Sequence, residues 1–111
     1  MITEARLDSC WGVCQREGDY GAMHNHTSPQ TQQKDLYSGM LYLELPVSLT
    51  ANTFPDGCLH LVTGERVVYI PPIKGCIALW PAEYMHGIHP FRGEGDRLGI
   101  AFNVAAVNKE E

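Results

Sequence analysis

The chain reads as a series of short apolar runs, each stopped by a cluster of glycine, proline, asparagine or aspartate. No stretch keeps a helical period for the roughly ten residues that a globular helix needs. Turn signals such as Pro55-Asp56-Gly57 separate the runs. The pattern predicts strands at residues 11–16, 20–26, 39–45, 58–62, 66–70, 75–80, 83–89 and 97–104. Short strands at regular spacing predict a β-sandwich or a β-barrel, and the absence of alternating strand and helix patterns argues against a parallel sheet.

The last predicted strand separates two sets of side chains by its alternation. Its two faces are Leu98, Ile100, Phe102 and Val104 on one side, and Arg97, Gly99, Ala101 and Asn103 on the other. We expect the apolar face to pack in the core. The small, polar face either meets solvent or leaves room for a ligand. A guanidinium at the rim of that face can donate two parallel hydrogen bonds to a carboxylate.

The composition is that of one ordinary globular domain covering residues 1–111. Apolar residues make up 44% and charged residues 19% of 111 residues, which makes disorder unexpected. The net charge of −5 gives no electrostatic reason to expect nucleic acid or an anionic membrane as a partner. No apolar stretch is long enough to span a bilayer, and the first ten residues do not resemble a signal peptide. We therefore expect a cytoplasmic protein.

The cysteines do not form a zinc motif. Cys10, Cys14, Cys58 and Cys76 include no Cys-x-x-Cys pair, the spacing that a cysteine zinc site favours. In a reducing compartment, scattered thiols usually act as small buried hydrophobes, and we expect that role here.

The histidines form a more informative pattern. His24 and His26 stand at the spacing that projects two side chains from the same face of a strand. Two neutral imidazoles placed in this way can hold a transition metal. A second pair, His86 and His89, lies far along the chain, so four of the five histidines fall into two pairs. The pattern favours a metal site over chance placement on the surface.

These features occur within an ordered chain of short motifs over residues 11–104. The motifs are Gly18-Asp19-Tyr20, His24-Asn25-His26, Ser38-Gly39-Met40-Leu41-Tyr42-Leu43, Pro72-Ile73-Lys74-Gly75, Trp80-Pro81, His86-Gly87-Ile88-His89-Pro90 and Arg97-Leu98-Gly99-Ile100-Ala101-Phe102-Asn103. The order and residue types of these motifs resemble those of a phage and marine-bacterial branch of small oxygenases that depend on iron(II) and 2-oxoglutarate. Each motif alone is weak, whereas their succession is fairly specific.

The resemblance implies a double-stranded β-helix, a jelly-roll or cupin-like barrel, with Fe(II) as cofactor and 2-oxoglutarate as cosubstrate. It places His24 and His86 as iron ligands and Arg97 on the far carboxylate of 2-oxoglutarate. His26 stands where the wider superfamily has a carboxylate, so the ligand set becomes His24, His26 and His86. Such enzymes decarboxylate 2-oxoglutarate to succinate and usually hydroxylate a second substrate. Here that substrate is an unidentified small molecule or peptide.

Several further side chains are candidates for the same site. Tyr42 and Tyr20 could hydrogen-bond a 2-oxoglutarate carboxylate, and His60 could line the cavity. Trp80 and Tyr84 could line the substrate mouth, although packing is the more ordinary role for a tryptophan. His89 is expected to face solvent.

Two other readings stay open. A cupin-type protein with three histidine ligands would not use 2-oxoglutarate; Gly18 and the His-x-His pair fit the first cupin motif, but no glutamate follows in residues 27–33. The second open reading is a binding or structural barrel whose bound metal is inert. Oxygenases of this superfamily usually add helices before the barrel, whereas this chain has about ten residues before its first predicted strand. We expect the exposed sheet to be covered by a second copy in a homodimer or by a partner chain.

Overall fold

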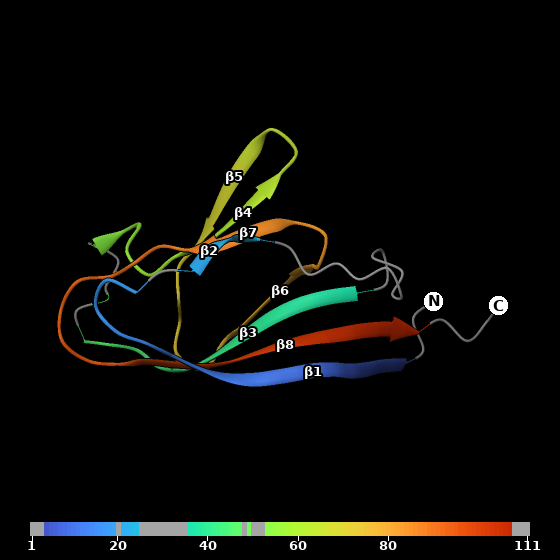
Figure 1. Ribbon diagram of the computed structural model, residues 1–111, viewed down its shortest axis with the longest axis horizontal. Helices are drawn as coiled ribbons and strands as arrows, with labels where there is room; N and C mark the ends of the chain where they lie inside the picture. The colour runs from blue at the N-terminus through green and yellow to red at the C-terminus, as the bar shows by residue number, and fades with distance from the viewer. Residues whose placement is uncertain (1–3, 20, 25–35, 48, 50–52, 108–111) are drawn as a thin grey trace.

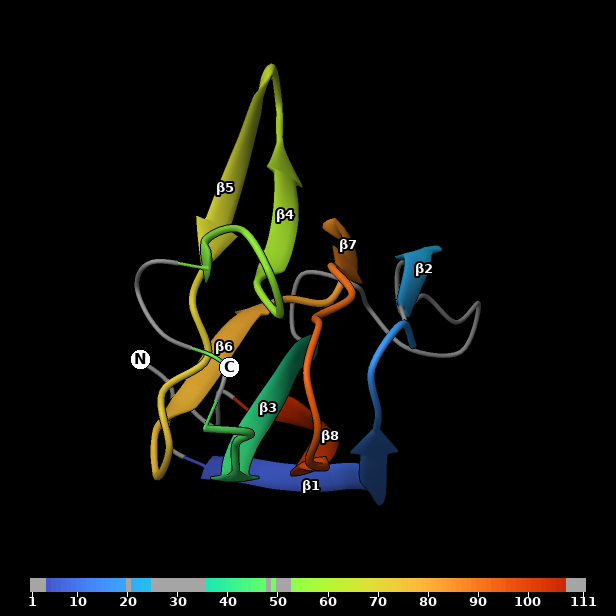
Figure 2. The same cartoon turned by 90° about the vertical axis from the view of Figure 1, so that its left-hand side faces the viewer.

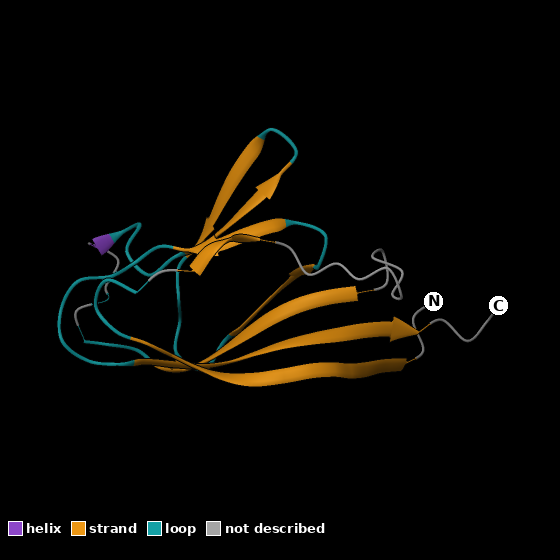
Figure 3. Ribbon diagram, in the orientation of Figure 1, coloured by secondary structure: helices purple, strands orange, loops and turns teal. Residues whose placement is uncertain are grey.

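The computed structural model describes residues 4–19, 21–24, 36–47, 49 and 53–107, with the backbone alone for residues 21–24 and 107. Among these residues, all regular structure longer than one turn is β-strand (Figure 3). The strands are β1 (Glu4–Gln15), β2 (Gly21–His24), β3 (Leu36–Glu44), β4 (Leu59–Thr63), β5 (Arg66–Ile70), β6 (Ile77–Pro81), β7 (Met85–Ile88) and β8 (Arg97–Val107). The described residues contain no helix that is long and apolar enough to cross a membrane.

The strands form two antiparallel sheets that face each other (Figures 1 and 2). The order β1-β8-β3-β6 makes what we call the major sheet, and β2-β7-β4-β5 makes the minor sheet. The hairpin of β4 and β5 extends away from the body of the molecule (Figure 1). Strands of one sheet are therefore linked by connections that cross to the other sheet, as in a double-stranded β-helix. The predicted all-β fold of this type is confirmed.

The core lies between the inner faces of the two sheets. Alternation along β3 buries Ser38, Met40 and Tyr42 and turns Leu41 and Leu43 toward the outside. The buried apolar cluster is Met40, Tyr42, Leu59, Leu61, Ala78, Trp80 and Ala101. Both sheets contribute to it, so the cluster holds them together by burying apolar surface from each side.

Each predicted strand is present; β5 has the predicted bounds, and the bounds of the other strands differ from the prediction. The largest difference is in β1, which begins at Glu4 rather than at residue 11. Its first residues mix charged and apolar side chains that are mostly exposed, and they extend the strand because Glu4 pairs with Val107 of the neighbouring β8. Hydrophobic periodicity cannot detect a strand held by its backbone ladder at a sheet edge.

The predicted orientation of β8 is wrong. Arg97, Ala101 and Asn103 are 2%, 8% and 8% exposed and face the core, whereas Leu98 on the expected core face is 37% exposed. The register explains this result: Ala101 pairs with Met40 of β3 on one side and with Trp11 of β1 on the other. Because directly paired residues share a face, the small residues of β8 lie on the inner face of the sheet with Met40.

The outer face of the major sheet is consequently apolar and uncovered in the described part of the chain. Leu7, Ile77 and Leu79 are 62%, 60% and 56% exposed. Phe102 lies over Gly39 of β3, so closely that a methyl group on Gly39 would overlap its ring. The expected homodimer would cover such a surface, and it stays a prediction.

The cysteine prediction fails for three of the four residues. Cys58 is buried, as expected, whereas Cys10, Cys14 and Cys76 are exposed. Cys10 and Cys14 pair with Phe102 and Leu98 of β8, which places both on the outer face of the major sheet. A small thiol is tolerated there as well as in a core, so its residue type alone does not determine burial.

Candidate active site

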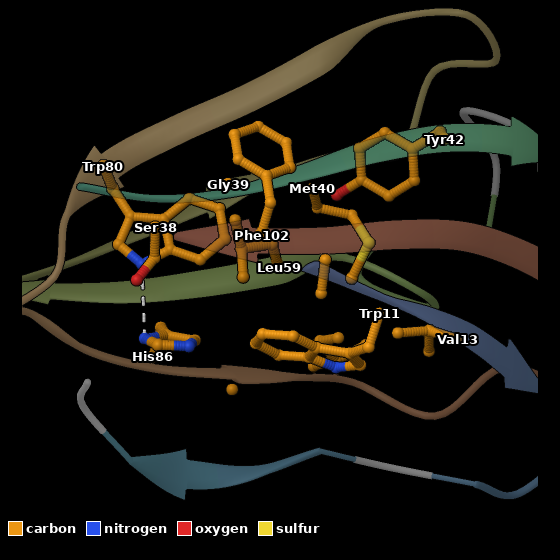
Figure 4. A pocket seen from close by; sticks show the side chains of 13 residues that line it. Trp11, Val13, Ser38, Gly39, Met40, Tyr42, Leu59, Trp80, His86 and Phe102 are labelled. Atoms are coloured by element: carbon orange, nitrogen blue, oxygen red, sulfur yellow. Dashed lines mark hydrogen bonds between the residues drawn. The ribbon is translucent and has the colours of Figure 1, made fainter. Parts of the chain in front are cut away.

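His86 lies on the inner face of the minor sheet and is 4% exposed. Its Nδ1 is 3.2 Å from the Tyr84 carbonyl oxygen and 3.3 Å from Nε1 of Trp80 (Figure 4). The two contacts need different tautomers, because the carbonyl only accepts a proton and the indole only donates one. When Nδ1 carries the proton and donates to Tyr84, Nε2 carries the lone pair, which is the form of imidazole that binds a metal.

The backbone of β2 brings a second predicted ligand to His86. Antiparallel pairing of β2 with β7 sets His24 directly opposite His86. Directly opposed residues share a face of a sheet, with Cβ atoms about 5 Å apart. His26, the third predicted ligand, lies outside the described residues. Within the described residues no group of three or more His, Cys, Asp or Glu side chains surrounds a point. The fit to a metal therefore depends on the His24–His86 register and on the His86 tautomer.

Arg97 lies at the start of β8 as a buried cation. Its Nη1 donates a hydrogen bond to the Gly57 carbonyl oxygen, and its Cζ lies 5.2 Å from the centre of the Tyr42 ring. Tyr42 of β3 pairs with Gly99 of β8, two residues beyond Arg97, and this register brings Tyr42 to the same end of the barrel as Arg97. A Cβ on Gly99 would lie 2.8 Å from the Leu41 carbonyl oxygen, which is too close for any other residue.

Two polar atoms at this end of the barrel lack a partner. Arg97 Nη2 and the Tyr42 hydroxyl are both buried, and neither makes a hydrogen bond within the described residues. Arg97 also forms no ion pair in that part of the chain; the ion pairs there join exposed residues near the surface. A buried guanidinium without a counter-charge is costly, and a carboxylate would satisfy both it and the hydroxyl.

Burial shifts the titration of these groups. It raises the pKa of Tyr42, although the charge of Arg97 offsets part of that effect. It also lowers the pKa of Arg97 and raises the pKa of the neighbouring Cys58 thiol. Tyr42 therefore keeps its proton at neutral pH and can donate it in a hydrogen bond to an anion. Arg97 stays charged because its ordinary pKa is so high.

A cavity of about 140 Å³ lies between the sheets, with both His86 and Tyr42 in its wall (Figure 4). Most of the remaining wall is apolar and includes Trp11, Met40 and Leu59. A cavity of about 150 Å³ can hold a molecule the size of benzene. The space therefore suits a small organic acid, and a larger substrate would have to bind outside it.

A chain of polar side chains that the sequence did not suggest as functional begins at Ser38 in the wall of this cavity. Ser38 Oγ donates to Asn103 Oδ1 at 2.7 Å, and Asn103 Nδ2 donates to Ser9 Oγ at 3.0 Å. These residues belong to β3, β8 and β1, and they share the inner face of the major sheet. Asn103 was visible as the last member of the small face of β8, but its partners depend on strand register.

The predicted site residues have different outcomes. His86, Arg97 and Tyr42 all face the interior, and His24 reaches the site by its backbone register. Tyr20 lies outside the described residues, as His26 does. Trp80 is 5% exposed and lines the cavity beside His86, and half-buried Tyr84 supplies its carbonyl oxygen to the same imidazole.

The two remaining histidines lie together. The placement of His60 was wrong: it does not line the cavity but lies on the outer face of the minor sheet, opposite to its neighbours Leu59 and Leu61. His89 lies on the same outer face and is half-buried, because its ring contacts His60. The error for His60 arises because a short strand shows which residues share a face and not which face is inner.

Comparison with known proteins first gives the class of the fold. Solved structures with a similar fold include a 2OG-Fe(II) oxygenase family oxidoreductase from Burkholderia pseudomallei, with a TM-score of 0.71, 14% identity and coverage of 92% of this chain and 45% of that one. HygX from Streptomyces hygroscopicus, with nickel and 2-oxoglutarate bound, has a TM-score of 0.65 at 16% identity, and the match covers 91% of this chain and 57% of that one. A prolyl-4-hydroxylase from Pseudomonas putida has a TM-score of 0.64 at 14% identity, and the match covers 96% of this chain and 55% of that one. The chain thus spans about half the length of these proteins and shares their double-stranded β-helix.

The family follows from the sequence itself. Residues 9–103 match the family model described as "Putative 2OG-Fe(II) oxygenase". This match covers most of the chain and includes every motif from the His-x-His pair to Asn103. The chain therefore belongs to this family of 2OG-Fe(II) oxygenases, and the resemblance inferred from its motifs is confirmed. No curated protein sequence matches the chain.

Proposed function

We propose that this protein is a non-haem iron, 2-oxoglutarate-dependent oxygenase of the hydroxylase type. His24, His26 and His86 would hold Fe(II), and Arg97 with Tyr42 would hold the far carboxylate of 2-oxoglutarate. One observation carries the proposal: a buried arginine and a buried tyrosine each have a polar atom without a partner within the described residues. A ligand carboxylate would supply two acceptor oxygens and the missing negative charge. The relatives include HygX, whose structure was determined with 2-oxoglutarate bound.

The residues of this chain would bind, orient and shield the reactants. Arg97 and Tyr42 give a charged and a neutral donor to one carboxylate, which selects for a diacid over a monoacid. In the tautomer with the proton on Nδ1, His86 would donate to the Tyr84 carbonyl oxygen, which would fix the imidazole ring and leave the Nε2 lone pair for a metal. Apolar walls from Trp11, Met40 and Leu59 exclude water from the cavity. When bound, iron and 2-oxoglutarate together supply the oxidative decarboxylation that is coupled to substrate hydroxylation.

His26 gives the proposed site an unusual charge. A neutral imidazole in place of a carboxylate leaves the bound metal one unit more positive. We expect this change to raise the reduction potential of the metal and to strengthen its hold on the anionic cosubstrate. The primary substrate would bind outside the small cavity and is proposed to be a small molecule or a peptide.

The test is binding of 2-oxoglutarate to protein loaded with Fe(II) without oxygen. We expect a weak visible charge-transfer band, followed by succinate formation when oxygen is admitted. Arg97→Gln should weaken 2-oxoglutarate binding at least about 100-fold, because it removes charge-assisted hydrogen bonds. Arg16→Gln is the matched control, since Arg16 is exposed and forms a surface ion pair with Asp96 at 3.4 Å. Iron binding without any band, or equal 2-oxoglutarate affinity in the two variants, would contradict the proposal and favour the cupin reading.

A further inference from the structure

A second pair of imidazoles lies on the outer face of the minor sheet. Nδ1 of His60 and Nδ1 of His89 are 2.9 Å apart, and their rings meet edge to face with centres separated by 4.7 Å. The ring of Tyr69 lies 5.5 Å from His89 and 6.2 Å from His60. His86 pairs with Leu61 on the inner face, so the outer pair is separated from the proposed iron site by the sheet itself.

Strand register explains why these two histidines meet. His60 of β4 pairs with Gly87 of β7, and His89 follows Gly87 by two residues on the same face. Glycine has no side chain, so both imidazoles can approach each other over position 87. The His89 backbone N–H also donates to the Cys58 carbonyl oxygen at 2.9 Å, which extends the β4–β7 ladder to His89. The backbones that carry the two rings are thus fixed relative to each other.

The separation of the two nitrogens suits a common metal ion. Imidazole nitrogens bind transition metals at about 2.0–2.1 Å, so two of them at a right angle are about 2.9 Å apart. The pair has this spacing. Right-angled ligand pairs occur in square-planar and octahedral coordination, which Cu²⁺ and Ni²⁺ adopt.

We propose that His60 and His89 form a second metal site, specific for divalent transition metals such as Ni²⁺ and Cu²⁺ and separate from the iron site. The metal takes the place of the proton that the two Nδ1 atoms share in the metal-free protein. That proton moves to Nε2 of the same ring, so both histidines stay neutral and both Nδ1 lone pairs bind the ion. Water completes the coordination shell. The bound ion joins β4 to the end of β7, and it should stabilise the folded protein.

Nickel binding to chelator-treated protein tests the proposal by calorimetry and thermal unfolding. The exposed thiols of Cys10, Cys14 and Cys76 are first blocked with iodoacetamide so that they do not compete for the ion. His60→Asn and His89→Asn should each abolish one equivalent of bound Ni²⁺, or weaken that site at least about tenfold. Each should also remove the part of the Ni²⁺-induced rise in Tm that this site contributes. Tyr69→Phe is the matched control, because it keeps the ring beside the two imidazoles and both ligand nitrogens.

A second background separates this site from the iron site. The double variant His24→Gln, His86→Gln removes two proposed iron ligands and should retain one equivalent of Ni²⁺, which His60→Asn then abolishes. In the wild-type background, His60→Asn should leave the iron and 2-oxoglutarate band intact. If the proposed function fails, that band is absent but the outer equivalent remains. If Ni²⁺ stoichiometry and affinity are the same with and without His60, the outer site does not exist and the pair is only a hydrogen bond.

Discussion

Replacing Arg97 by methionine should separate ligand binding from stability. Arg97 is 2% exposed, with one hydrogen bond to Gly57 and a contact with the Tyr42 ring. Removing the charge relieves a desolvation penalty of several kcal/mol. It also removes a charge-assisted hydrogen bond of about 1.5–3 kcal/mol and a cation–π contact of up to about 2 kcal/mol. These terms nearly cancel, so Arg97→Met without ligand should differ from wild type by about 1 kcal/mol or less, or be more stable.

Binding of 2-oxoglutarate should make the wild type more stable than Arg97→Met. In the presence of metal, 2-oxoglutarate at 100 times its Kd should stabilise the wild type by about 2.7 kcal/mol, and Arg97→Met should gain almost nothing. For a domain of this size, the gain corresponds to a Tm increase of about 10 °C. Urea unfolding and thermal unfolding, each with and without 2-oxoglutarate, measure both quantities. Arg16→Met is the control, because its side chain is 76% exposed and should keep the full ligand response.

One result would refute this reasoning. If Arg97→Met loses more than about 3 kcal/mol without ligand, then Arg97 behaves as one member of a satisfied buried ion pair. Its charge would then have a partner within the protein, and no ligand carboxylate would be needed to explain it.

Three further predictions follow from single side chains. Tyr42→Phe removes a hydroxyl without a partner among the described residues, so unfolding without ligand should change little, whereas 2-oxoglutarate affinity should fall about tenfold in a titration. Gly39→Ala should destabilise the fold by about 1–3 kcal/mol in urea because of its overlap with Phe102, whereas Gly12→Ala, with nothing within 4 Å, should be neutral; equal effects would mean that the ring moves aside. The depressed pKa of His60 means that the unfolded chain takes up a proton first as the pH falls below about 6.5, so stability should decline from there down to the folded-state pKa. His60→Asn should flatten this decline in denaturant midpoints measured between pH 7 and 5, and an unchanged slope would assign it to other groups.

The strands were predictable because glycine and proline mark their ends. Each of the eight observed strands overlaps a predicted one, since turn residues interrupt every apolar run. The orientation of β8 was not predictable from its own alternation. Both of its faces are compatible with burial, and the partner Met40 decides which one faces the core.

The candidate site was only partly predictable. The order of His86 and Arg97 along the chain indicated the family, because the motifs that carry both residues are local in sequence. The contacts that these residues make in the folded protein are not determined by the local sequence. That Arg97 has an unpartnered nitrogen beside Tyr42, and that His60 meets His89, depends on pairings between distant strands. Such pairings arise from tertiary packing and cannot be obtained from residue spacing.

The position of the short strand β2 implies that the proposed iron would also stabilise the edge of the minor sheet. β2 has four residues at the edge of the minor sheet, and within the described part of the chain it pairs with β7 alone, with register partners Gly21–Ile88 and His24–His86. So short an edge strand has few ladder hydrogen bonds to resist opening. An ion shared by His24 and His86 would cross-link the two strands at their last pair. Amide hydrogen exchange in β2 should therefore slow when metal is added, and the rate of metal loss should be limited by the opening of this edge.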